Sequence, residues 1–228
     1  MSSLFSRKEL GPSLCAARQP IVDLDGAVVG YELLFRSGSE NCCSVWDRTQ
    51  ASSKMFDLAC RYGLEVLAKG RPAFINCTRQ TLLEGSIELF SSQSVVAEVL
   101  EGVAPDEAVR AACLRLKSLG YRIALDDYEP GDNREPLAGL ADIVKADVQQ
   151  LSAAELLQLA DAFRHSSTTL LAEKVETIEE FSFARKAGFQ LFQGYYIDGP
   201  ELIHAPVAAT VGEEPSVLVF EPEVGAAE

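Results

Sequence analysis

Short apolar runs recur along most of this chain, and seven of them end on a polar or charged residue. A fully buried strand that ends on such a residue presents that side chain to a site. From Asn76 to Gln193 the successive run ends are 19 to 28 residues apart, about one strand plus one helix. In a parallel barrel the carboxyl ends of the strands face one mouth, so these side chains would converge there. The residues are Glu32, Asn76, Glu98, Asp126 with Asp127, Lys145, Glu173 and Gln193.

The same pattern predicts the order of the elements. Residues 15–22 and 27–36 form an expected antiparallel pair around the turn signal Asp25-Gly26. An apolar stripe predicts a helix from about Asp47 to Lys69, which Gly70 would end. Thereafter we expect strands at 72–77, 94–100, 121–127, 142–148, 168–175 and 190–197, separated by helices at 78–90, 105–119, 136–141, 152–165 and 177–187. Such alternation implies an α/β fold with parallel pairing and the helices outside.

One domain of barrel size accounts for the 228 residues. We expect a lead-in at 1–13, a barrel domain at 14–204 and an acidic tail at 205–228. From residue 211 onward there are five acids and no base, and Pro215 and Pro222 flank an SVLVF patch. The composition favours a flexible tail, and a short edge-pairing or partner-binding strand is the alternative.

The net charge of the chain argues against some classes of binding partner. The formal net charge is −14, which argues against a DNA or RNA duplex or an anionic membrane as a broad-surface partner. The first residues lack the apolar core of a signal peptide, and no apolar run is long enough to span a bilayer, so we expect a cytoplasmic protein. The six cysteines form no CxxC pair and there are two histidines, so any metal must be held by oxygen ligands.

Carboxylates that converge on one mouth repel one another, and divalent cations remove that conflict. Hard oxygen ligands fit Mg²⁺ or Mn²⁺, and the adjacent Asp126 and Asp127 can serve two ions. Two such ions would clamp a phosphodiester and activate a water molecule as the nucleophile. Lys145 could hold that water or serve only as an ion-pair partner. Arg36 could bind a phosphate oxygen or form a plain salt bridge.

These residues belong to motifs that resemble the EAL domain family over about residues 14–200. The motifs are QPIV at 19–22, YELLFR at 31–36, FIN at 74–76, AEVLE at 97–101, IALDD at 123–127, DIVKADV at 142–148, LLAEKVET at 170–177 and FQGYY at 192–196. The resemblance implies a modified TIM (β/α)8 barrel with one antiparallel strand. It also implies hydrolysis of the bacterial messenger cyclic di-GMP to linear pGpG with two Mg²⁺ or Mn²⁺ ions.

The resemblance further implies a role for each matching position. Metal ligands would be Glu32, Asn76, Glu98, Asp126, Asp127 and Glu173. Catalytic roles would fall to Lys145, Glu173, Gln193 and Glu32, and substrate contacts to Gln19, Arg36 and Asp127. Glu101 and Glu176 would support the loops near the site.

Two positions depart from the family's pattern. The loop at 128–133 reads YEPGDN where active members continue with Phe-Gly, and Lys174 stands where glycine is usual. With GYELLFRSG and AEKVET, these departures resemble the branch normally joined to an HDOD domain, whose members are often regulatory. They therefore favour a second hypothesis, a catalytically weak cyclic di-GMP receptor or protein-interaction module. A homodimer or a regulatory protein partner is compatible with either hypothesis.

Overall fold

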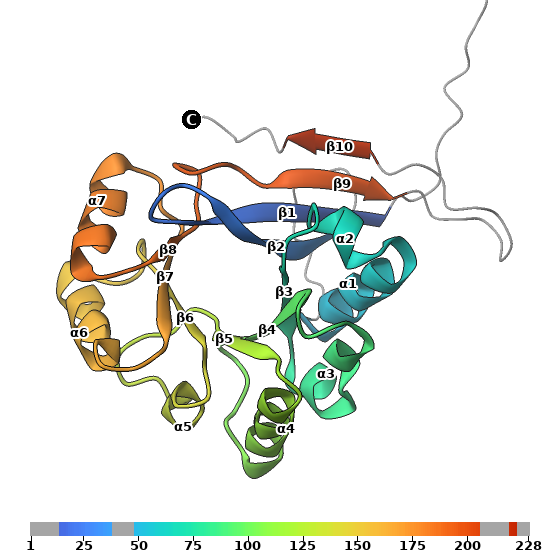
Figure 1. Cartoon of the computed structure of the whole chain (residues 1–228), viewed down its shortest axis with the longest axis horizontal. Helices are drawn as coiled ribbons and strands as arrows, with labels where there is room; N and C mark the ends of the chain where they lie inside the picture. The colour runs from blue at the N-terminus through green and yellow to red at the C-terminus, as the bar shows by residue number, and fades with distance from the viewer. Residues whose placement is uncertain (1–13, 38–47, 206–218, 223–228) are drawn as a thin grey trace, which may run out of the picture.

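A ring of eight strands, β1 to β8, forms the centre of the computed structural model, which describes residues 14–37, 48–205 and 219–222 (Figure 1). The ring strands are β1 Leu14–Asp23, β2 Val28–Ser37, β3 Ala73–Cys77, β4 Val95–Val99, β5 Arg122–Leu125, β6 Ile143–Asp147, β7 Thr169–Glu173 and β8 Leu191–Phe192. Neighbours from β2 to β8 pair in parallel, whereas β1 is antiparallel to both β2 and β8. The predicted barrel with one antiparallel strand is confirmed.

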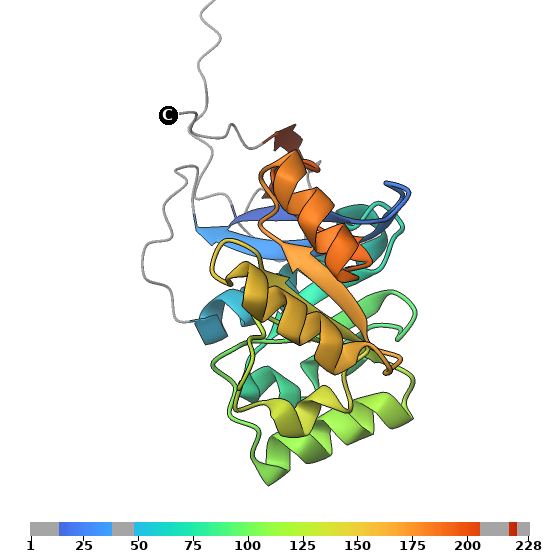
Figure 2. The ribbon, with the colours of Figure 1, turned by 90° about the vertical axis from the view of Figure 1, so that its left-hand side faces the viewer.

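Helices lie outside the ring and fill the crossovers between successive parallel strands (Figures 1 and 2). They are α1 Arg48–Tyr62, α2 Leu64–Leu67, α3 Arg79–Glu84, the 3-10 helix η1 Ser86–Leu89, α4 Glu107–Ser118, α5 Glu135–Ala138, α6 Ala153–Phe163 and α7 Ile178–Ala187. The apolar faces of the longer helices pack on the outward side chains of the strands in one large core. None of the described helices is long and apolar enough to cross a bilayer.

Two further strands follow the ring. β9 Glu201–Ala205 pairs antiparallel with the first half of β1, and β10 Val219–Pro222 pairs antiparallel with β9. The sequence pattern predicts no strand at 201–205. For the acidic tail an edge-pairing strand is the alternative to a flexible segment, and Val219–Pro222 forms such a strand.

Several predicted boundaries are wrong for identifiable reasons. The single helix expected over 47–69 is interrupted at Gly63, whose φ is 79°, and its expected first residue lies outside the described residues. The helix expected over 78–90 ends at Gly85, where a left-handed conformation starts the 3-10 turn instead. The strand expected over 121–127 ends at Leu125, and that expected over 190–197 spans two residues.

Candidate active site

Six apolar side chains form a separate cluster that we call the inner layer. Its members are Ile21, Phe74, Val96, Ala124, Ile143 and Leu171, each from a different strand. Two residues after the last five come Asn76, Glu98, Asp126, Lys145 and Glu173. Because side chains two apart in a strand share a face, these polar groups stack on the inner layer toward the carboxyl ends of the strands. β1 runs in the opposite direction, so its matching residue, Gln19, comes two residues before Ile21.

Lys145 lies at the centre of this polar layer with a side chain that is 0% exposed. Its Nζ is 2.6 Å from Glu173 Oε1, 2.9 Å from Asp126 Oδ1 and 3.7 Å from Glu32 Oε2. It also donates a short hydrogen bond to Glu98 Oε1. One ammonium therefore faces four carboxylates, and this buried group retains an excess of negative charge when all four are ionised.

Burial and mutual repulsion oppose ionisation of these acids. Burial raises the pKa of Glu173 to about 7, and the Glu32 and Asp127 carboxylates add to the effect while Lys145 opposes it. Burial likewise raises the pKa of Asp126 well above its ordinary range, with Glu173, Glu32, Asp127 and Glu101 contributing. A bound cation would offset the repulsion between these carboxylates and so favour their ionised form.

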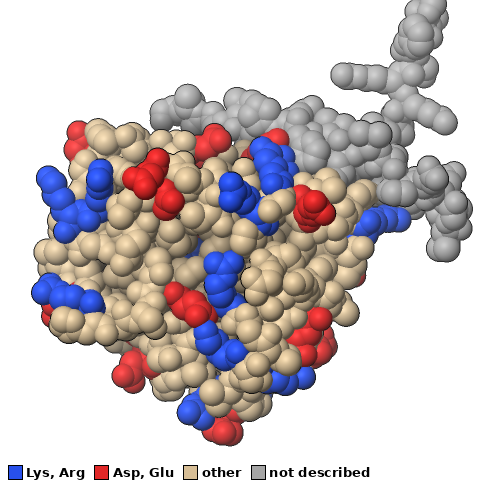
Figure 3. Space-filling view, viewed as in Figure 1, with Lys and Arg blue, Asp and Glu red and all other residues tan. Residues whose placement is uncertain are grey.

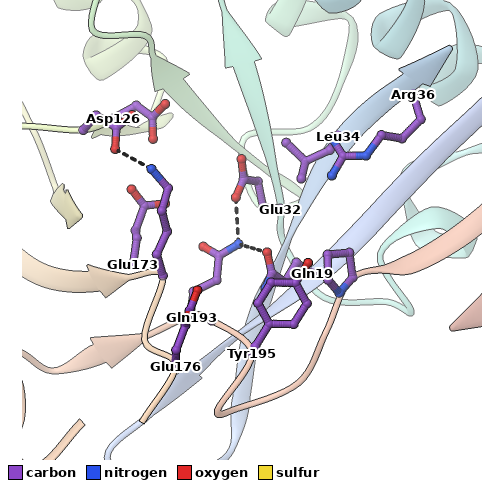
Figure 4. A pocket seen from close by; sticks show the side chains of 13 residues that line it. Gln19, Glu32, Leu34, Arg36, Asp126, Glu173, Glu176, Gln193 and Tyr195 are labelled. Atoms are coloured by element: carbon purple, nitrogen blue, oxygen red, sulfur yellow. Dashed lines mark hydrogen bonds and ion pairs between the residues drawn. The ribbon is translucent and has the colours of Figure 1, made fainter. Parts of the chain in front are cut away.

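The side chain of Gln193 connects Glu32 on β2 with Gln19 on β1. Its Nε2 lies 2.7 Å from Glu32 Oε2 and 3.2 Å from Gln19 Oε1 (Figure 4). The following residue, Gly194, has a φ of 151°, and a Cβ there would lie 2.2 Å from the carbonyl oxygen of Val175. A glycine is therefore required for the chain to turn at this point with Gln193 directed inward.

A cavity of about 340 Å³ opens above the polar layer. In Figure 4, Asp126 and Glu173 lie on one side of it and Leu34 and Arg36 on the other. Tyr195, Glu176 and Pro200 also line it, and Tyr195 is 56% exposed. An arginine opposite a group of acids is suited to an anionic ligand that is also bound through cations.

The oxygen atoms of this site fit divalent metal ions. Carboxylate oxygens of Glu32, Glu98 and Glu173 lie within 4.8 Å of one another, and those of Glu101, Asp126 and Asp127 form a second such group. Glu98 Oε2 and Asn76 Oδ1 are buried without a hydrogen-bond partner among the described residues. Since buried oxygens normally find a partner, Glu98 Oε2 supports the interpretation of the first group as metal ligands, and Asn76 Oδ1 is a further candidate ligand. Asn76 borders Glu98 across β3 and β4, but it lines a neighbouring cavity rather than the main one.

Arg134, a fully buried residue that organises the loop after Asp126 and Asp127, is not among the predicted site residues. Its guanidinium donates to the carbonyl oxygens of Val99 at 3.0 Å, Asp126 at 2.7 Å and Asp127 at 3.3 Å. It also forms an ion pair with Asp132 at 2.6 Å. Asp127 has a φ of 44°, and these bonds hold the left-handed turn that brings both aspartates to the mouth. The signal in the sequence was a basic residue two positions after an aspartate in the unusual loop.

The two residues expected to support loops lie at the rim. Glu101 forms an ion pair with Arg48 and lies beside Asp126 and Asp127. Glu176 lines the cavity, and its backbone N–H donates to Glu180 Oε2 at 2.7 Å. Their roles in the loops stay predictions.

Outside the site, basic and acidic side chains are mixed on the surface of the molecule that faces the viewer in Figure 1. Figure 3 shows positive and negative side chains interspersed on this face, without one continuous acidic patch. The net charge of −14 therefore does not gather on this side of the molecule.

Comparisons with known proteins agree with this geometry. A sequence model described as the EAL domain matches residues 7–200. The uncharacterised protein YuxH of Bacillus subtilis is 35% identical over 82% of this chain and 47% of its own length. The cyclic di-GMP phosphodiesterase CdgJ of Vibrio cholerae is 31% identical over 82% of this chain and 44% of its own length. The chain thus spans about half the length of the curated relatives it matches.

A solved structure supports the fold. The EAL-domain protein YkuI of Bacillus subtilis, in complex with its substrate cyclic di-GMP and calcium, has a TM-score of 0.67 and 21% identity to this chain. The likeness covers 81% of this chain and 54% of YkuI.

Proposed function

Because this chain belongs to the EAL domain family, we propose that it hydrolyses cyclic di-GMP to linear pGpG with two Mg²⁺ or Mn²⁺ ions bound. The observation that carries the proposal is the buried Lys145 among four carboxylates, next to a cavity that also contains Arg36. CdgJ, a relative at 31% identity, is a cyclic di-GMP phosphodiesterase, and YkuI binds the dinucleotide with calcium.

Glu32, Asn76, Glu98 and Glu173 would hold one ion, Asp127 would hold the other, and Asp126 could serve either. When bound, the ions would supply Lewis acidity that favours ionisation of water and offsets charge on the phosphate. Lys145 would orient that water from its position among the carboxylates. Arg36, on the opposite side of the cavity, would hold a phosphate oxygen and align the ester bond. Gln193 would fix Glu32 through its hydrogen bond, and Gln19 would hold Gln193 in place.

The test is a single-turnover assay with purified protein, Mn²⁺ or Mg²⁺ and cyclic di-GMP, in which pGpG is measured by chromatography. We expect product from the natural chain and none from Glu32→Ala, which should also bind Mn²⁺ more weakly. Lys145→Ala should lose product with metal binding retained. Arg164→Met is the matched control, because Arg164 is an exposed partner of Asp161 and does not line the cavity. Absence of product at high enzyme concentration, with nucleotide binding intact, would eliminate the proposal, and equal metal loss in the two site variants would overturn the roles assigned.

A second candidate function is a cyclic di-GMP receptor or partner-regulating module with weak or absent turnover. The observation that favours it is the loop held by Arg134, in which 128–133 departs from the pattern of active family members. Relation to the branch joined to an HDOD domain is part of this proposal. Calorimetry with cyclic di-GMP tests it: micromolar binding without product supports a receptor, whereas absent binding together with no captured partner contradicts it.

A further inference from the structure

Lys174 occupies an unusual place beside the site. It directly follows the site residue Glu173 and has a φ of 55°. A residue with a Cβ is disfavoured in this left-handed region relative to the right-handed one. Its carbonyl oxygen accepts a hydrogen bond from Gln149 Nε2 at 3.1 Å, which helps to hold this backbone. The conformation directs the side chain toward the rim of the cavity, which Lys174 lines.

The ammonium of Lys174 lies between two aspartates. It donates a short hydrogen bond to Asp147 Oδ2 and lies 3.6 Å from Asp127 Oδ1. Asp147 is 4% exposed, and its Oδ1 accepts from the backbone N–H of Gln149 at 2.8 Å. Asp147 is therefore a fixed anchor. The Lys174 side chain is half exposed, so it can leave Asp127 without disturbing the core.

The two carboxylate groups of the site differ in the cations that the protein supplies. In the group Glu101–Asp126–Asp127 each acid has a basic partner: Arg48 for Glu101, Lys145 for Asp126 and Lys174 for Asp127. The group Glu32–Glu98–Glu173 shares one ammonium, that of Lys145. A divalent ion therefore meets an excess of negative charge at Glu32–Glu98–Glu173, whereas at Glu101–Asp126–Asp127 it must compete with one basic side chain for each acid.

We propose that Lys174 is an internal counter-ion that competes with a divalent cation for Asp127, so that the two metal positions have unequal affinities. Glu32–Glu98–Glu173 is the tight position, and Glu101–Asp126–Asp127 is the weak one, filled when Lys174 withdraws toward Asp147. The inference rests on the two-ion site of the proposed function. It makes occupancy of the second position, and with it turnover, depend on the free metal concentration.

The test is Mn²⁺ titration of the metal-free full chain by calorimetry, with electron paramagnetic resonance to detect coupled Mn²⁺ pairs. We expect one tight and one weak site, with affinities at least about tenfold apart. Lys174→Met removes the charge but keeps the length, and should tighten the weak site about tenfold while the tight site is unchanged. Lys174→Arg and the exposed-surface control Lys186→Met should behave like the natural chain. Lys174→Gly, which suits the left-handed backbone, replaces Lys174→Met if that variant does not fold.

Two outcomes overturn the inference: two equally tight sites in the natural chain, or a weak site that Lys174→Met and Lys174→Gly leave unchanged. These readouts do not use hydrolysis. If the affinities change as stated but no pGpG forms, the inference stands and the proposed function fails. If pGpG forms and the affinities do not change, the reverse holds.

Discussion

At the scale of single residues, the buried carboxyl group of Glu173 would couple the proposed metal binding to pH. Its side chain contacts Lys145 Nζ at 2.6 Å and shares the polar layer with Glu32 and Asp126. Burial raises its pKa from the ordinary value of 4.5 to about 7, so in the absence of metal the folded state holds a proton that the unfolded state has already lost. A divalent ion held by Glu173, as proposed, would have to displace that proton.

The consequence for stability has a definite sign. Between about pH 4.5 and 7 the folded protein binds more protons than the unfolded chain, so its stability falls as the pH rises through this window. In EDTA we expect the melting temperature to fall by several degrees from about pH 5 to about pH 8. Glu173→Gln should flatten part of this slope, and Mn²⁺ should raise the melting temperature most at the higher pH. If the melting temperature of Glu173→Gln depends on pH as steeply as that of the natural chain, Glu173 is not the group responsible.

Single residues also show what the sequence can and cannot reveal. Glu32, Glu98, Lys145 and Glu173 were predicted as site residues because each ends an apolar run, and the structure brings them within contact of one another. Arg134 follows no run, and three of its partners are backbone carbonyl oxygens, which carry no side-chain signature. Its importance emerges only after the loop has folded.

At the scale of elements, the loop between β5 and α5 depends on one buried ion pair. Arg134 and Asp132 are 0% and 8% exposed in their side chains, and the guanidinium also satisfies carbonyl oxygens from the end of β4 and from the aspartate pair. Removing one partner of such a pair leaves the other buried and uncompensated.

We therefore predict that Arg134→Met lowers the free energy of unfolding by about 3–5 kcal/mol and weakens Mn²⁺ binding. The loss of binding follows because the turn that presents Asp126 and Asp127 loses its hydrogen bonds. Urea denaturation and calorimetry measure the two effects. Arg164→Met, at an exposed pair, should change stability by no more than about 0.5 kcal/mol. Similar losses in the two variants would show that the loop does not depend on Arg134.

Element types were easier to predict than element ends. Each expected ring strand exists, because short apolar runs that end on a polar residue recur at the spacing of one strand plus one helix. The predicted ends of helices and strands are wrong where a glycine with a positive φ ends the element although apolar residues continue. Gly194 stops β8 after two residues although the sequence continues with Tyr195, Tyr196 and Ile197, and Gly85 breaks the helix expected over 78–90. β9 was missed because five residues of mixed polarity give no reliable period.

At the scale of the whole molecule, β1 closes the ring and also starts the outer ribbon of β9 and β10. Its second half pairs with β8 through Val22 and Asp23, and its first half pairs with β9 over five residues. β10 covers the free edge of β9 along four residues and contains Pro222, which cannot donate to a further strand. Exposed edges without such protection promote association between chains.

Removing residues 206–228 should therefore leave the barrel folded but promote self-association through the uncovered edge of β9. Light scattering after size-exclusion chromatography measures this. Because the truncation also removes five acids, Phe220→Pro serves as the matched variant, since it impairs pairing by β10 at unchanged charge. If both variants stay monomeric at concentrations where the full chain is monomeric, β10 does not protect the edge.

The stacking of one polar residue per strand on the inner layer has a consequence for how such proteins diverge. The six apolar side chains of the inner layer pack together with Val29 and Leu191, and this packing does not depend on the polar residues above it. A lineage can thus exchange a ligand of the ions, or gain a competing lysine, and still inherit the same shape and the same hollow. Descendants that have lost turnover would keep a ready receptor for the ancestral ligand, so enzymes and sensors can arise from one another by few substitutions.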